Sequence, residues 1–148
     1  DYLVEVIDWE LNVDPEFVKN RFMSPIPVKP DAEMAAAGYS EKWICYRSAA
    51  FSAKELTVEP GAKCTIKDMG ATGIITVQGR GRINHLPLES PTMIRFGEMT
   101  EDEVFITAKR AAEGYEIENL AKECPLVILR YFGPDVNPQA PAIGSYTR

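Results

Sequence analysis

The chain has 148 residues, a formal net charge of -6 and an isoelectric point near 4.9, a length that suits a single domain with a substantial core. Such an acidic chain lacks the basic surface of a general nucleic-acid or anionic-membrane binder. Its apolar runs stay well short of the roughly 20 residues of a membrane helix, and residues 1–10 lack the basic-then-apolar order of a signal peptide. We therefore expect neither a nucleic-acid nor a membrane partner.

Three cysteines (Cys45, Cys64 and Cys124) are scattered along the chain without a C-x-x-C pair. An odd, scattered set is typical of reduced thiols in a cytosolic protein and not of a disulfide framework. We therefore expect a cytoplasmic protein whose cysteines act as small apolar residues on strands. The chain begins at Asp1 and not at a methionine, which leaves open a preceding segment.

Residues 1–42 are predicted to form an arm that lies across the main domain. In "NVDPEFVKNRF", Asp14 is suited to the N-cap and Pro15 to the first position of a short helix. The stretch "VEVIDWEL" at residues 4–11 is expected to add a strand to a partner's sheet edge, which predicts a homodimer through the arm.

The second part of the arm is rich in proline. Three prolines within residues 25–30 predict an extended connector. Residues 32–40 then predict one helical turn that ends at Gly38.

From residue 43 to residue 134 the sequence predicts an all-β domain of short strands. Strand-like runs recur about every ten residues between Gly, Pro, Asn or charged clusters, as in a β-sandwich or a jelly-roll barrel. In "FSAKELTVE", alternation places Lys54, Leu56 and Val58 on one face. The predicted strands are residues 43–49, 51–59, 64–68, 73–79, 82–86, 92–97, 103–107, 115–119 and 126–132.

One segment fits either a helix or two strands, and another lacks a regular pattern. Residues 101–123 have helical propensity, but the β-branched and aromatic run "VFIT" and the break at Gly114 favour strand, loop and strand. Residues 135–148 are predicted to be a loose C-terminal tail.

Two regions of the strand series carry a resemblance to a known fold. In "PGAKCTIKDMGATGIITVQGRGRI" at residues 60–83, a Pro60-Gly61 turn precedes an apolar strand that is expected to end in a Gly79-Arg80-Gly81 turn. In residues 101–131, "EDEVFITA" has the pattern of an acidic turn followed by an apolar strand, and "YEIENLAKECPLVILRYF" has the pattern of the closing strands. Residues 60–81 and 101–131 resemble the two motifs of the cupin superfamily. The resemblance implies a cupin-like jelly-roll barrel at residues 43–134.

The resemblance also implies that the usual cupin metal ligands are missing. Metal-binding cupins supply two histidines and a glutamate from the first motif and a histidine from the second. The matching positions here carry Lys67 and Met69, Thr72 on or beside the glutamate place, and Tyr115. Protonated lysine has no free lone pair, and Met and Tyr are poor ligands for a hard or borderline ion. We therefore expect neither a metal nor another cofactor.

Other metal sites are not indicated. The only histidine, His85, lies where the predicted strand 82–86 gives way to the loop-like stretch "NHLPLES", and the cysteines lack the spacing of metal ligands. Among cupins, "FSAKELTV", "GIITVQGRGRI" and "EDEVFITA" most resemble the C-terminal domain of class I phosphomannose isomerases. That domain holds no metal, and the chemistry lies in the preceding domain, so the resemblance implies an accessory role.

Lys67 is the first candidate for ligand binding. Its motif position is expected to point into the barrel, with Asp68 on the opposite face, and a buried ammonium group requires a compensating anion. The hypothesis is a small anionic or sugar-like ligand at Lys67, Met69, Thr72 and Tyr115. In the alternative reading, Lys67 reaches solvent or pairs with Glu113 or Glu116.

The "GRGR" stretch offers a weaker candidate. Gly79 and Gly81 with Arg80 and Arg82 suit a phosphate cradle, but a simple turn needs glycines too, and we keep only Arg82 as a candidate ligand residue.

Two functions remain open from sequence. One is a non-catalytic module that binds a small ligand or serves as an accessory domain. The other is a metal-independent sugar-phosphate isomerase that uses Lys67, Tyr115 or Glu113 at the barrel mouth. The absence of a recognisable acid–base pair favours the first.

Overall fold

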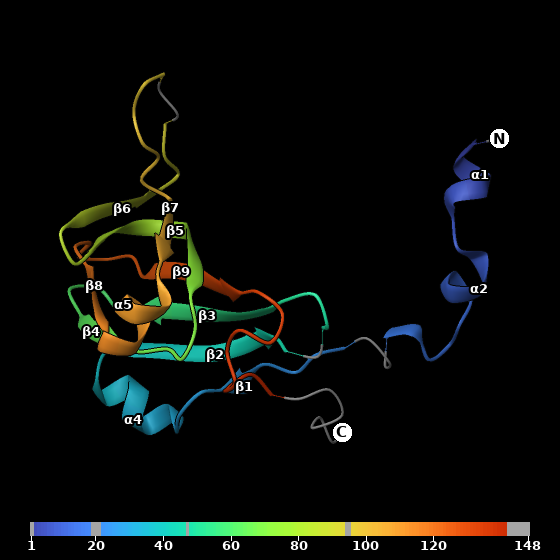
Figure 1. Cartoon of the computed structure of the whole chain (residues 1–148), viewed down its shortest axis with the longest axis horizontal. Helices are drawn as coiled ribbons and strands as arrows, with labels where there is room; N and C mark the ends of the chain where they lie inside the picture. The colour runs from blue at the N-terminus through green and yellow to red at the C-terminus, as the bar shows by residue number, and fades with distance from the viewer. Residues whose placement is uncertain (1, 19–21, 47, 94–95, 142–148) are drawn as a thin grey trace.

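The computed structural model describes residues 2–18, 22–46, 48–93 and 96–141. The chain folds into a curled, antiparallel β structure with a few short helices, and this confirms the predicted all-β jelly-roll class (Figure 1). No described helix is both long and apolar enough to span a membrane. The elements are α1 (Tyr2–Val6), α2 (Trp9–Asn12), β1 (Ile26–Pro27), α4 (Asp31–Ala36), β2 (Tyr39–Cys45), β3 (Ser52–Val58), β4 (Lys63–Ile66), β5 (Thr72–Ile83), β6 (Leu86–Ser90), β7 (Glu103–Ile106), α5 (Ala108–Glu113), β8 (Tyr115–Asn119) and β9 (Leu126–Phe132).

Strand β5 joins the two halves of the barrel. Its first part pairs with β7 and β9, in the sheet that continues through β3, β2 and β1. Its last part pairs with β6 and β8, and β8 in turn pairs with β4. The strand can serve both sheets because its register shifts between Thr76 and Gln78, and such a bulge bends a strand.

The predicted turn at residues 79–81 is therefore wrong, since these residues lie inside β5. Gly79 has φ +92°, and a Cβ there would lie 2.6 Å from the carbonyl oxygen of Pro125. A Cβ on Gly81 would lie 2.3 Å from the carbonyl oxygen of Glu118. The two glycines permit close strand packing, and the chain reverses later, beside Asn84 with φ 51°.

The apolar core follows from strand alternation. Successive side chains of a strand point to opposite faces, and the inward residues of β3, β5, β8 and β9 include the fully buried Leu56, Ile74, Ile117 and Ile128. As predicted for residues 51–59, Lys54, Leu56 and Val58 share the buried face of β3.

Two segments between strands differ from expectation. Residues 92–93 and 96–97 form no strand, and they belong to a loop that projects from the barrel between β6 and β7 (Figure 1). The preference for strands at 103–107 and 115–119 is confirmed, but helix α5 replaces the predicted loop between them. Its helical propensity prevails locally, with Thr107 as N-cap and Gly114 at φ +101° after its end.

The arm agrees with prediction only in part. Residues 17–18 are helical and the Asp14 side chain accepts a hydrogen bond from the Glu16 amide (2.9 Å), as the capping pattern predicts, while residues 19–21 lie outside the described part. The extended connector and the turn that ends at Gly38, with φ +75°, are confirmed. The predicted strand at residues 4–11 is wrong, because α1 and α2 are helical.

The two ends of the chain also differ from expectation in how they lie against the barrel. Only the later part of the arm, from Met23 onward, packs against the barrel, whereas α1 and α2 lie apart from it (Figure 1). The predicted loose tail is not loose at its start, where Asn137 is buried.

Candidate functional site

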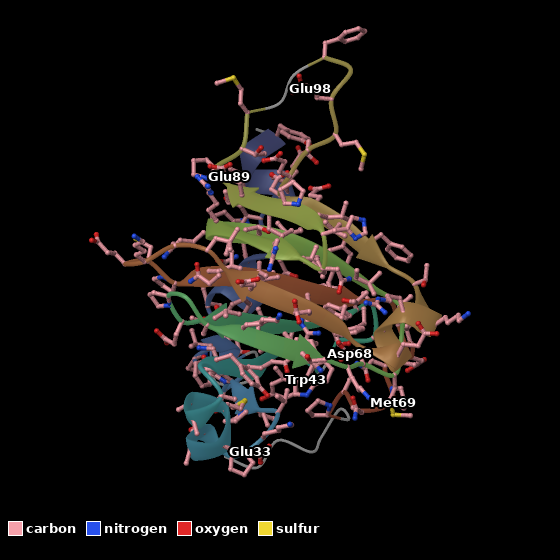
Figure 2. All side chains as sticks on the ribbon, turned by 90° about the vertical axis from the view of Figure 1, so that its left-hand side faces the viewer. Glu33, Trp43, Asp68, Met69, Glu89 and Glu98 are labelled. Atoms are coloured by element: carbon pink, nitrogen blue, oxygen red, sulfur yellow. The ribbon has the colours of Figure 1, made fainter. Side chains whose placement is uncertain are left out.

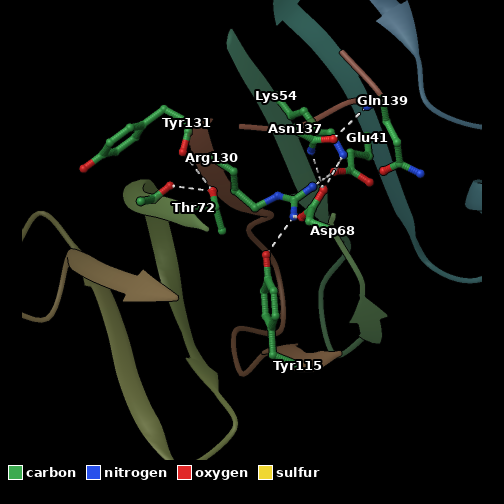
Figure 3. Close-up of polar contacts among 10 residues, drawn as sticks. Glu41, Lys54, Asp68, Thr72, Tyr115, Arg130, Tyr131, Asn137 and Gln139 are labelled. Carbon is green, nitrogen blue, oxygen red and sulfur yellow. Dashed lines mark hydrogen bonds and ion pairs between the residues drawn. The ribbon is translucent and has the colours of Figure 1, made fainter. Parts of the chain in front are cut away.

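A cluster of buried charged and polar side chains lies in the interior of the barrel, beside the apolar core. We call it the interior cluster, and its exposed fractions do not exceed 6% for any member. It consists of Glu41, Lys54, Asp68, Tyr115, Arg130 and Asn137 (Figure 3). These side chains come from β2, β3, β8, β9 and the segments after β4 and β9, so residues far apart in the sequence meet here.

Strand alternation directs the charged side chains of Lys54 and Arg130 toward the interior. On β3, Lys54 continues the inward series of Leu56 and Val58. On β9, Arg130 follows Leu126 and Ile128 in the same way, and it is 0% exposed. Within the apolar runs of both strands, a cation therefore occupies a core position.

Lys54 is held from several sides. Its Nζ lies 2.7 Å from Asp68 Oδ1 and 3.6 Å from Glu41 Oε1. It also lies 4.6 Å from the centroid of the Trp43 ring and 5.5 Å from that of Phe132. The negative faces of aromatic rings stabilise a desolvated ammonium group.

Arg130 bridges both carboxylates. Its Nη1 donates to Asp68 Oδ2 and, at 2.7 Å, to the Tyr115 hydroxyl, while its Nη2 forms an ion pair with Glu41. Asn137 completes the cluster by donating from Nδ2 to Asp68 Oδ1 at 3.3 Å. The segment after β9 thus closes the charged interior.

The interior cluster is electrically balanced, with two cations and two carboxylates. Burial raises the pKa of Asp68, and the charge of Lys54 opposes that shift. Burial and the nearby Asp68 carboxylate also raise the pKa of Tyr115, so the phenol stays protonated at neutral pH. With its charges paired, the cluster leaves no surplus charge to attract an ionic ligand.

The residues present do not fit a cupin-type metal. Within the described ranges, no group of three His, Cys, Asp or Glu side chains is placed to hold an ion. In addition, Lys54 and Arg130 already neutralise the carboxylates that face the interior, and their positive charges would repel a divalent cation.

The sidedness predicted around Lys67 is wrong. Lys67 is exposed and Asp68 is buried, because Ile66 is an inward residue and the next inward position is 68. Neither proposed partner binds Lys67: Glu116 pairs with Lys63 at 2.7 Å, and Glu113 lies beside Lys109 and Arg110.

Of the predicted ligand residues, Lys67 and Met69 line one pocket of about 230 Å³, and the others lie elsewhere. Met69 is 63% exposed, and Thr72 is buried and donates to the carbonyl oxygen of Tyr131 at 3.0 Å. Arg82 lies outside the barrel and donates from Nε to Glu118 at 2.6 Å. Of the predicted set, only Tyr115 belongs to the interior cluster.

Lys67 does border a pocket, whose lining combines the exposed Lys29, Thr65 and Lys67 with the buried Tyr39, Glu41 and Ile66. This pocket has a volume of about 310 Å³, and we call it the Lys29–Lys67 pocket. Lys29 Nζ lies 3.2 Å from Glu33 Oε1, and this contact raises the pKa of Lys29. In the described part of the chain, Lys67 forms neither an ion pair nor a side-chain hydrogen bond. Figure 2 shows Asp68 and Met69, the two residues that follow Lys67 in the chain, at the lower side of the barrel near Trp43.

Sequence reasoning missed most of the interior cluster. The signal was present for Lys54 and Arg130, since each stands at an inward position of an alternating strand. No local pattern indicates Asn137, which reaches Asp68 across 69 residues of sequence.

No protein-family model and no curated protein matches this chain. Solved structures do resemble it. The cupin 2 domain-containing protein of Halorhodospira halophila has a TM-score of 0.50 and 20% identity over 68% of this chain and 67% of its own. This likeness shows a cupin-type fold.

Two further structures are similar at lower scores. A mutant of the Bacillus subtilis oxalate decarboxylase OxdC has a TM-score of 0.49 and 19% identity, over 76% of this chain and 28% of its own. A chain of the Rhodobacter sphaeroides SigE complex with the anti-sigma ChrR has a TM-score of 0.48 and 10% identity, over 64% of this chain and 44% of its own. Our chain thus spans less than half the length of either protein.

Proposed function

We propose that this chain is a non-catalytic cupin-fold module that binds a small anion of the sugar-phosphate type in the Lys29–Lys67 pocket. One observation carries the proposal: the exposed ammonium group of Lys67 has no ion-pair partner among the described residues and borders a pocket of about 310 Å³ beside a second lysine. An ammonium group is a strong donor to phosphate oxygens.

The rest of the pocket lining suits such a ligand. Tyr39 and Thr65 contribute hydroxyl-bearing side chains, which suit a phosphate or a sugar hydroxyl. Glu41 is the one carboxylate of the lining, and its charge is compensated from the interior by Arg130 and Lys54. It therefore repels an anion less than a free carboxylate would.

The balanced interior supports a non-catalytic role. An isomerase that used Lys67, Tyr115 or Glu113 as acid and base would need at least two of these side chains on one substrate. Tyr115 is 1% exposed and bonded to Arg130, whereas Lys67 is exposed and Glu113 lies beside Lys109 and Arg110. The buried and bonded Tyr115 is thus not placed to share a substrate with the exposed Lys67.

An accessory role beside a catalytic domain fits this reading. The finer resemblance to phosphomannose isomerases rests on the sequence patterns alone. A module that binds a sugar phosphate without acting on it would serve such an enzyme by holding substrate or product near a separate active site.

Calorimetric titration with glucose 6-phosphate, inorganic phosphate and glucose tests the proposed site. We expect the two phosphates to bind and glucose to bind more weakly. Lys67→Gln should weaken phosphate binding about tenfold or more, since a hydrogen bond to a charged group contributes roughly 1.5–3 kcal/mol. Lys122→Gln is the matched control, because Lys122 is an exposed lysine outside the pocket. No binding by the wild type, or equal losses in both variants, would overturn the proposal.

A further inference from the structure

The first part of the arm, residues 2–18, exposes a series of large apolar side chains to solvent. Its helices α1 and α2 have only 5 and 4 residues, and isolated helices shorter than about 12 residues are marginal. Figure 1 shows both helices away from the barrel. The exposed apolar residues of this segment are Tyr2, Val4, Val6, Ile7, Trp9, Val13, Phe17 and Val18.

The charge of the chain is divided unevenly between the first part of the arm, residues 1–18, and the remainder of the chain. Residues 1–18 hold six of the 22 acidic residues and none of the 16 basic residues, which leaves 16 of each kind in the remainder. Two arms therefore repel each other, whereas the neutral remainder of another copy does not repel an arm. Arm-to-barrel contact is favoured over arm-to-arm contact.

A pocket of about 540 Å³ lies at the end of the barrel where the arm leaves, and we call it the exit pocket. Tyr46 fixes its place, because Tyr46 lines the pocket and its hydroxyl donates to the carbonyl oxygen of Ser24 at 2.8 Å. Its lining is rich in aromatic, proline and alanine side chains, with Asp135 as the one charged member, and comprises Tyr46, Ser48, Ala49, Phe51, Ser52, Gly133, Pro134, Asp135, Asn137, Pro138, Ala140 and Pro141.

We propose that the arm of one copy seats its apolar side chains, Trp9 foremost, in the exit pocket of a second copy, in a reciprocal two-fold dimer. Because arm and pocket lie at the same end, a two-fold axis there brings each arm to the other copy's pocket. The proline-rich connector at residues 25–30 is anchored on the barrel, where Ile26 and Pro27 pair with Trp43 and Lys42 of β2.

The exposed apolar side chains of the arm supply a substantial part of the surface that such a dimer needs, and the exit pocket of the same copy supplies the rest of each partner's share. Trp9 is 53% exposed and Tyr2 is 75% exposed. A whole aromatic side chain can bury about 150–250 Å², so the exposed apolar side chains of the arm together offer several hundred Å² of contact surface. A stable interface needs roughly 800 Å² per partner. Phe51 lines the exit pocket and is 46% exposed, so its ring is available to contact an apolar side chain of the other copy's arm.

Analytical ultracentrifugation of the full chain, from about 1 to 200 μM, tests this dimer. We expect a concentration-dependent dimer whose Kd rises about tenfold or more in Trp9→Ala and in Phe51→Ala, as for a central aromatic contact. The control is Phe96→Ala, which changes a fully exposed aromatic residue of the loop between β6 and β7. A wild type that stays monomeric, a dimer unaffected by Phe51→Ala, or an equal loss in the control would overturn the proposal.

Fluorescence gives a second readout. The chain has two tryptophans, and Trp43 is buried, so added acrylamide quenches mainly Trp9. We expect quenching to decrease as dimer forms. Dimer formation with unchanged quenching would show that Trp9 stays in solvent and would overturn its placement in the pocket. Neither measurement depends on the proposed anion site.

Discussion

Lys54 Nζ lies 2.7 Å from Asp68 Oδ1 in the barrel interior, where the two side chains are 4% and 0% exposed. Each is surrounded by further partners: Lys54 by the rings of Trp43 and Phe132, and Asp68 by Arg130 and Asn137. Desolvated charges are costly singly and tolerable only as a complete set. The interior is therefore stable because it is balanced, and it is poorly suited to admit an extra ion.

Removing one charge from this set should strongly destabilise the fold. Asp68→Asn leaves Lys54 and Arg130 with Glu41 as the one remaining carboxylate of the cluster. We expect the free energy of unfolding to fall by about 3–5 kcal/mol, because an uncompensated buried charge remains. Urea denaturation followed by circular dichroism measures the loss.

The control for this variant is a charge pair at the surface. Lys42 Nζ lies 3.0 Å from Glu55 Oε1, with side chains 42% and 31% exposed. Glu55→Gln should cost less than about 1 kcal/mol, since solvent screens such a pair. Equal losses for Asp68→Asn and Glu55→Gln would contradict a charge-balanced interior.

The same balance predicts indifference to divalent metals. Added zinc, manganese or iron should not raise Tm, and a chelator should not lower it, because two cations occupy the positions beside the interior carboxylates. Elemental analysis of the purified protein gives an independent measurement. One equivalent of any of these metals per chain would refute this prediction.

How far the sequence predicts the site is shown best by Lys67 and Asp68. The family motif placed Lys67 inside, but the alternation from Ile66 places Asp68 there. A shift of one residue exchanges the two faces of a strand, so a motif alignment without residue-level periodicity assigned the wrong side chain. Local alternation was the more reliable guide, and it also puts Lys54 inside.

Contacts between segments far apart in the chain could not be predicted from the sequence. "GPDVNP" has the composition of a turn, and nothing in it indicates that Asn137 reaches Asp68. The strands themselves were predictable, because their apolar and β-branched residues favour strands locally and are also the residues that the barrel buries. The helical arm was not, because isolated short segments have weak preferences of their own.

Gly79 supplies a prediction about the fold. It was expected in a turn, but it stands in β5 at φ +92°, with the Pro125 carbonyl oxygen 2.6 Å from where a Cβ would lie. Gly61 has φ +71° and open space around its Cβ position. Gly61→Ala should therefore cost about 1 kcal/mol for its backbone conformation alone, and Gly79→Ala about 3 kcal/mol or more, since two strands must also separate. Thermal unfolding of both variants measures the difference, and equal costs would argue against close packing at Gly79.

The cysteines give a prediction about pH. Burial raises the pKa of the Cys64 thiol from 9.0 to about 12, whereas Cys124 is exposed. At pH 8 a thiol reagent should therefore label Cys124 quickly and Cys64 only after unfolding, because the thiolate is the reactive form.

The same shift makes stability depend on pH in a stated direction. The folded state keeps the Cys64 proton between pH 9 and about 12, while the unfolded state loses it, so the folded state binds more protons in this window. The contribution of Cys64 is complete below pH 9 and is lost as the pH rises, by up to about 1.4 kcal/mol for each pH unit. Denaturation at pH 8, 9 and 10 of the wild type and of Cys64→Ala measures it. A variant whose stability declines as steeply as that of the wild type would assign the pH dependence to other groups.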